Sequence, residues 1–146
     1  MSPIAHVLIS TGAGAALAYV SHSSEAGMAC VIGGVLIDLD HHLDYFFAKK
    51  KIPWTLGQIR DYYDGEKAGK LFLLFHSYEL LLILWLLYYF CGGDIFLGVL
   101  FGATGHLICD QFYNPLKPLS YFLFYRIQNG FEKKNLFNKE HYEKHF

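Results

Sequence analysis

The sequence predicts an all-α integral membrane protein, an antiparallel bundle of four helices with an interfacial aromatic segment and a polar C-terminal tail. Hydrophobic residues make up 53% of the 146 residues and charged residues only 17%, whereas soluble domains usually carry about 25% charged residues. Four apolar runs alternate with polar segments. We therefore predict a single membrane-embedded helical domain over residues 1–131 and a polar cytoplasmic tail over residues 132–146, which we expect to be solvated.

The four apolar runs differ in length. The run Leu71–Cys91 alone reaches the roughly 20 residues with which a helix spans a bilayer. The other runs are shorter, and they can span a membrane if the polar side chains near one end face the inside of a bundle. They are Ile4–Val20, Ala26–Ile37 and Ile95–Cys109.

Short connections predict two helical hairpins. Residues 21–25 join the first two runs and residues 92–94 join the last two, so the helices of each pair must be antiparallel. Gly98 and Gly102 have the GxxxG spacing that lets helices approach closely in lipid. Pro115 and Pro118 should end the last helix, and the aromatic segment 121–131 should lie along the cytoplasmic interface.

The positive charges predict the orientation in the membrane. Both short turns lack Lys and Arg, so the positive-inside rule places the two termini and the long middle connection in the cytoplasm of a multi-pass inner (cell) membrane protein. A cleaved signal peptide is the competing interpretation of the first run, although no positive charge precedes it. The twelve cations are Lys49, Lys50, Lys51, Arg60, Lys67, Lys70, Lys117, Arg126, Lys133, Lys134, Lys139 and Lys144.

Histidines and acids of the four runs are expected at one depth. Measured from the outer end of each predicted helix, at about 1.5 Å per residue, they lie roughly 18–24 Å deep. This depth corresponds to a layer near the cytoplasmic face of a hydrocarbon core about 30 Å thick. The members of the layer are His6, Asp38, Asp40, His41, His76, His106 and Asp110.

The stretch GGVLIDLDHH places two acids next to two histidines. Asp38 and Asp40 are rotated by about 200° on an ideal helix, so both can face one centre only if the helix ends or unwinds there. One of them would then support the site from outside, and the role of His42 stays open. We expect both acids at the carboxyl end of a helix, where the dipole disfavours anions, so a cation should compensate them.

A metal ion is the cation that this residue set favours. Imidazoles and carboxylates in a partly dry layer are ligands for zinc, manganese or iron. We predict one or two divalent ions, zinc first. Lysines from the middle connection could compensate the acids instead, and a single buried histidine is more often a hydrogen-bonded packing residue. The common depth of the residues favours a shared metal site.

Four short motifs carry these residues: IAHVLIS contains His6, LIDLDHH contains Asp38, Asp40 and His41, LFHSYE contains His76, and GATGHLICDQFYNP contains His106 and Asp110. In order and context, over residues 1 to about 115, they resemble the motifs of a family of membrane-bound metal-dependent hydrolases, the LexA-binding inner-membrane hydrolase type. In this sequence Ile37 stands where that family has proline, and a family His-Arg-Gly triplet is missing before LFHSYE. The resemblance implies a metal-dependent hydrolase with these residues as ligands.

We therefore expect a hydrolase in which a metal activates a water near the cytoplasmic interface. A site at that depth suits a phosphoester of an amphiphilic or lipid substrate. Glu79, one helical turn from His76, is the candidate general base. The bilayer is the expected partner, and no nucleic acid is expected to bind.

A non-catalytic membrane protein is the alternative hypothesis. Seven ligand candidates can close a tetrahedral site, and a closed site is structural. A metal or proton carrier would need polar residues that continue to the outer face, where the first, third and fourth runs have almost none. A soluble helical domain would need polar helix faces, and LLILWLLYYF has none.

Overall fold

The structure is a computed structural model that describes residues 3–65 and 69–145, so Lys67 lies outside the described residues. Within these ranges the chain is helical, with isolated β-bridges and no strand, which confirms the predicted all-α class. The elements are α1 (Pro3–Ser21), α2 (Ser24–Leu36), the 3₁₀ turn η1 (Ile37–Leu39), α3 (Asp40–Lys49), α4 (Leu56–Gly65), α5 (Tyr78–Cys91), α6 (Asp94–Tyr113), the 3₁₀ turn η2 (Pro118–Tyr121), α7 (Leu123–Gln128), α8 (Lys133–Leu136) and α9 (Lys139–His145).

The chain divides into two compact units. The first, which we call the apolar unit, consists of Met1–Asp38 and Tyr78–Asn114. The second, which we call the basic unit, consists of Leu39–Ser77 and Pro115–Phe146. By sequence, all twelve Lys and Arg belong to the basic unit, although the division follows from contacts and not from charge.

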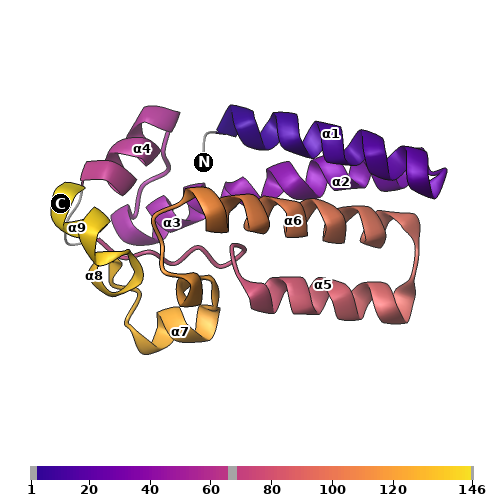
Figure 1. Cartoon of the computed structure of the whole chain (residues 1–146). Coiled ribbons are helices and arrows are strands. Elements are labelled where there is room, and N and C mark those ends of the chain that lie inside the picture. The colour runs from indigo at the N-terminus through magenta and orange to yellow at the C-terminus, as the bar shows by residue number, and fades with distance from the viewer. Residues whose placement is uncertain (1–2, 66–68, 146) are drawn as a thin grey trace. The chain divides into compact units, whose positions relative to one another are not determined.

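The apolar unit contains four helices. Helix α2 packs against both α1 and α6, α1 also contacts α6, and α5 packs against α6, as Figure 1 shows. Short turns join α1 to α2 and α5 to α6, as the sequence predicts. In the second turn Gly92 and Gly93 have φ angles of 63° and 90°, a region that glycine enters without a steric penalty.

Glycines bring the backbones of α2 and α6 together. A Cβ atom at Gly98 would collide with the carbonyl oxygen of Ala26, and one at Gly102 would collide with that of Cys30. The predicted GxxxG contact is therefore confirmed. On the other side of α2, Gly27 and Gly14 of α1 form a second close contact.

Three helical segments are long and apolar enough to cross a membrane: Ile4–Ser21, Ser24–Lys49 and Asp94–Tyr113. Helix α5 is apolar but has only 14 residues, and none of its described residues is buried. Large apolar side chains of the apolar unit are exposed, such as Leu82 and Tyr89. Such a surface fits lipid as its surroundings.

The basic unit has a core of its own. Leu71, Leu73, Leu136 and Phe137 are buried together, with partly buried aromatic side chains packed around them. The expectation that residues from Glu132 onward are solvated is wrong here, because α8 supplies Leu136 to this core. The tail is polar on average, but its two consecutive apolar residues, Leu136 and Phe137, pack into the core and hold the tail in place.

The third apolar run does not form one long helix. Helix α5 begins at Tyr78, and residues 71–77 are non-helical. The backbone N–H of Phe72 donates to Asp44 Oδ1, and the N–H groups of Phe75 and His76 donate to Asp40 Oδ2. The side-chain carboxylates replace the carbonyl acceptors of a helix, so the prediction of a spanning helix over Leu71–Cys91 is wrong. His76 is therefore not on a shared helix face with Glu79.

Gly102→Ala is expected to destabilise the protein by about 1–3 kcal/mol, because the new methyl group meets a backbone carbonyl that cannot move aside. Gly105→Ala, three residues along the same helix, is the control, since nothing lies within 4 Å of its Cβ position. The control should be neutral or slightly stabilising. Thermal unfolding in detergent measures the difference, and equal unfolding temperatures would contradict the glycine contact.

Candidate metal centre

The apolar unit gathers four of the predicted site residues. His6 comes from α1, Asp38 from η1, and His106 and Asp110 from successive turns of α6. The His6 Nε2 atom lies 3.0 Å from Asp110 Oδ1, and His106 Nε2 lies 3.4 Å from Asp110 Oδ2 and 3.5 Å from Asp38 Oδ1. Three sequence segments thus place two imidazoles and two carboxylates in one cluster.

The orientation of His106 is fixed by the backbone of α2. Its Nδ1 lies 2.7 Å from the carbonyl oxygen of Gly34. A carbonyl can only accept, so Nδ1 must carry the proton, and the neutral ring then has its lone pair on Nε2. Gly34 lies in the last turn of α2, just before the 3₁₀ turn. The hydrogen bond fixes the tautomer of His106 and holds its ring against α2.

A positive charge between His106 and the carboxylates would stabilise the cluster. The Nε2 lone pair of a neutral His106 would face the oxygens of Asp38 and Asp110. A nitrogen lone pair and a negatively charged carboxylate oxygen repel each other. Protonation of the ring would relieve this repulsion, and so would a metal ion. The ring of His6 stacks on that of His106, with centroids 3.7 Å apart and planes 12° apart, so two protonated rings would repel each other.

The donor set fits a divalent metal. One ligand atom each from His6, His106 and Asp110 lies within 4.8 Å of the others, and the three residues are buried. These buried groups could hold a metal ion. The nitrogen of His106 that faces away from the cluster, Nδ1, donates to the Gly34 carbonyl. Histidines that bind a metal through one ring nitrogen usually donate a hydrogen bond from the other. Asp38 keeps 25% of its side chain exposed, so the cluster is accessible on that edge.

The basic unit holds the other three predicted ligands. Asp40 is buried in the first turn of α3, and its Oδ2 atom accepts from the N–H groups of Phe75 and His76. The same oxygen lies 3.2 Å from His76 Nδ1. The carboxylate therefore favours a proton on Nδ1 and the lone pair on Nε2, the arrangement of a carboxylate that positions a metal ligand. His41 packs its ring against those of His76 and Tyr63.

The structure resolves part of the question about the two acids. The regular α-helix is interrupted by a 3₁₀ turn at Ile37–Leu39, which contains Asp38 and precedes Asp40. Asp38 contacts His106, whereas Asp40 contacts the segment that carries His76. The expectation that Asp40 ends a helix is wrong, because the chain continues from the 3₁₀ turn into α3 and Asp40 lies in its first turn.

One shared site for all seven residues stays a prediction, since four belong to the apolar unit and three to the basic unit. Glu79 lies in the first turn of α5, and its role as general base also stays a prediction.

The sequence does not predict that three charged residues of the basic unit are buried. Asp44 accepts from the Tyr63 hydroxyl and from Phe72 N–H. Arg126 donates to the carbonyls of Phe72, Leu73 and His76. Asp44 follows Asp40 by four residues, so helical spacing could have identified it. Arg126 had no comparable signal beyond being the only charge in an aromatic segment.

Lys133 is the third of these residues. Its Nζ donates to the carbonyls of Tyr62 and Tyr63 in the last turns of α4, where a cation interacts favourably with the helix dipole. Burial and the neighbouring Asp44 carboxylate raise the pKa of Tyr63 well above its usual value. Tyr63 therefore remains a neutral donor to Asp44 at physiological pH.

Comparison with known proteins adds no assignment: no protein-family model, curated protein or solved structure matches the chain. The site is therefore argued from its own geometry.

Arg126→Lys is expected to lower the free energy of unfolding by about 2 kcal/mol, because one ammonium cannot reach carbonyls that a planar guanidinium bridges. Amide hydrogen exchange of residues 71–77 should accelerate at the same time. Lys134→Gln is the control, since Lys134 forms an exposed ion pair with Glu132 that is worth little. Unchanged exchange in Arg126→Lys would show that the guanidinium does not hold this segment.

Proposed function

We propose that the protein is a metal-dependent hydrolase of the cell (inner) membrane. The observation that carries this proposal is the buried cluster of His6, Asp38, His106 and Asp110, in which the His106 Nε2 lone pair faces two carboxylates. Such a cluster is costly without a cation, and its donors are those of zinc. Zinc is the first candidate ion, with manganese or iron as alternatives, and one or two ions can be considered.

The membrane placement rests on the two units. We propose that α1, α2, α5 and α6 form an antiparallel four-helix bundle in the bilayer, with residues 121–131 at the interface and both termini in the cytoplasm. The apolar surface of these helices supports it, and so does the complete separation of Lys and Arg into the basic unit.

In this proposal the candidate residues have separate roles. His6, His106 and Asp110 would hold the ion, with Asp38 at the exposed edge of the cluster. The ion would polarise the scissile bond and make a water more acidic. Asp40 would position His76 through Nδ1, and Glu79 is the candidate that accepts a proton from water.

The position of the cluster suggests a substrate class. A site near the interface suits a substrate that sits in the bilayer with its head group in water, such as a lipid phosphoester. The resemblance of the four motifs to membrane-bound metal-dependent hydrolases supports the same reaction type. The exposed edge at Asp38 gives a water or a substrate a way to the cluster.

A structural metal is the second candidate. The cluster joins three sequence segments, α1, η1 and α6, as a metal that holds short helices together would. Under this alternative, removal of the metal lowers the unfolding temperature and no substrate is turned over.

The experiment measures metal content, unfolding temperature and phosphoester hydrolysis of the detergent-purified full chain. The proposal expects stoichiometric metal in the wild type and its loss in His106→Ala and Asp110→Asn. His22→Asn is the control, because His22 lies at the α1–α2 turn, and asparagine tolerates its positive φ angle.

Glu79→Gln separates the two candidates. It should keep the metal and lose turnover by about 100-fold or more if Glu79 is the general base. Bound metal with no hydrolysis of any phosphoester, together with a large loss of stability on chelation, would favour the structural role. A folded wild type without bound metal would overturn both.

A further inference from the structure

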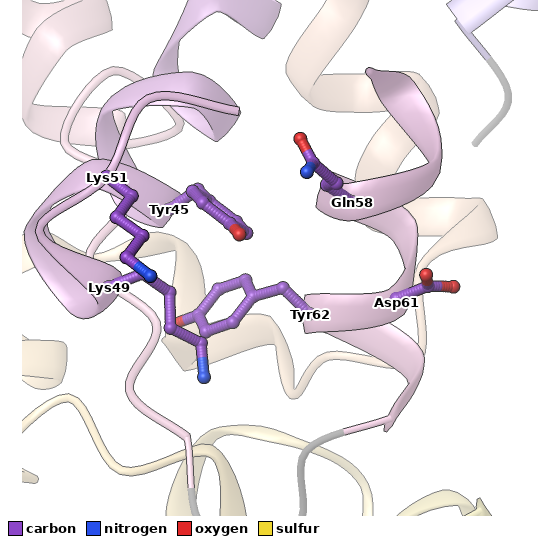
Figure 2. A pocket seen from close by; sticks show the side chains of 6 residues that line it. All are labelled: Tyr45, Lys49, Lys51, Gln58, Asp61 and Tyr62. Carbon is purple, nitrogen blue, oxygen red and sulfur yellow. The ribbon is translucent and has the colours of Figure 1, made fainter. Parts of the chain in front are cut away.

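A pocket in the basic unit is lined by residues of α3 and α4 and of the connection between them, none of which is a candidate metal ligand. It has a volume of about 370 Å³, within the range of small-molecule sites. Figure 2 shows lysine side chains on one side, a glutamine on the other and two tyrosine rings between them. The lining residues are Tyr45, Lys49, Lys51, Gln58, Asp61 and Tyr62.

The turn after α3 brings two lysines to the pocket. Helix α3 ends at Lys49, and Lys50 follows in the left-handed region with φ 55°, its N–H donating to the carbonyl of Phe46. This turn places Lys49 and Lys51 on the pocket while Lys50 is not part of its lining. The chain therefore separates three consecutive lysines into two that line the pocket and one that does not.

The opposite wall is fixed by the start of α4. Gln58 Oε1 accepts from the backbone N–H groups of Trp54 and Thr55, and Gln58 N–H donates to Thr55 Oγ1. This reciprocal capping pattern stabilises the helix start. Because Oε1 is taken by two donors, the Gln58 amide presents its NH₂ group as a donor to a ligand.

The floor of the pocket is an aromatic pair with positive charge around it. The rings of Tyr45 and Tyr62 meet edge to face, with centroids 5.8 Å apart. Lys49 Nζ lies 5.8 Å from the Tyr62 ring centroid, and the buried Lys133 Nζ lies 4.4 Å from it. Among the described residues that line the pocket, Asp61 is the one acid, and in Figure 2 its carboxylate points away from both rings, whereas two lysines line the pocket.

We propose that this pocket binds a phosphate group, carried by a lipid head group or free in solution. Two ammonium groups, the Tyr45 hydroxyl and the Gln58 amide are donors that a phosphate can accept from. The lipid source is favoured, because the connection between α3 and α4 exposes Ile52 and Trp54, and exposed tryptophan is typical of the bilayer interface. The choice of a lipid rests on the membrane placement proposed above, whereas phosphate binding does not need a metal or hydrolysis.

Isothermal titration of the full chain in an uncharged detergent tests the pocket. The probes are dihexanoyl phosphatidic acid, inorganic phosphate, and dihexanoylglycerol as the phosphate-free control. Wild type should bind the phosphatidic acid, and each of Lys49→Gln and Lys51→Gln should weaken binding by about fivefold. The double variant should lose roughly 20-fold, whereas Lys50→Gln, the neighbouring control, should bind like the wild type.

The comparison of probes identifies the source of the phosphate. Tighter binding of phosphatidic acid than of inorganic phosphate supports the lipid head group, and equal binding supports free phosphate. Three results would overturn the proposal: wild-type binding in the double variant, equal loss in Lys50→Gln, or binding of dihexanoylglycerol as tight as that of phosphatidic acid.

A repeat after treatment with EDTA keeps this proposal separate from the proposed hydrolase. Unchanged binding supports a lysine pocket, even if the protein proves to hold no metal and to hydrolyse nothing. Loss of binding on chelation would assign the phosphate to a metal centre and overturn the lysine pocket.

Discussion

The hydrogen bond from His106 Nδ1 to the Gly34 carbonyl is the contact on which the candidate metal centre depends. It fixes the tautomer, and with it the nitrogen that faces Asp38 and Asp110. The bond can form only because α2 and α6 approach closely, and this approach needs glycine at positions 98 and 102. At Gly34 itself a Cβ would lie 3.2 Å from the backbone carbonyl oxygen of Gly102, so the residue that accepts from His106 is also part of the close contact between α2 and α6.

A second constraint shapes the basic unit. Residues 71–77 are not helical, so their peptide groups need other partners. Asp40 and Asp44 accept from the N–H groups and Arg126 donates to the carbonyls, so charged side chains hold this segment from both sides. Charge-assisted hydrogen bonds are stronger than neutral ones, which suits a segment that must present His76 in one orientation. The buried charges in this unit therefore have a structural role.

The sequence predicts the elements that depend on local pattern. Helices α1, α2 and α6 follow from apolar runs between short turns, and the GxxxG spacing identifies the glycine contact, because these signals lie within one segment. Helix geometry also indicates that Asp38 and Asp40 cannot face one centre on a regular helix, and in the structure the two acids contact different partners. Of the site residues, His106 and Asp110 are spaced i, i+4 on α6, and His6 of α1 lies beside them.

The failures share one physical cause. The run Leu71–Cys91 is uniformly apolar, so nothing local shows that carboxylates 28 and 35 residues earlier in the chain take its N–H groups. Likewise Arg126 and Lys133 are buried only because carbonyls from distant segments accept their protons. Side-chain to backbone bonds between remote segments leave no periodic signal, so residue type and spacing cannot predict them.

The most direct test of the account is ¹⁵N NMR of the histidine side chains during a zinc titration of the detergent-solubilised protein. We expect the Nε2 signals of His6 and His106 to shift with one equivalent of zinc, while His106 Nδ1 keeps its proton and His22 does not respond. The opposite result is a His106 ring that carries protons on both nitrogens at neutral pH and is unaffected by zinc. That result would make the cluster an ion pair between helices and would contradict the metal centre.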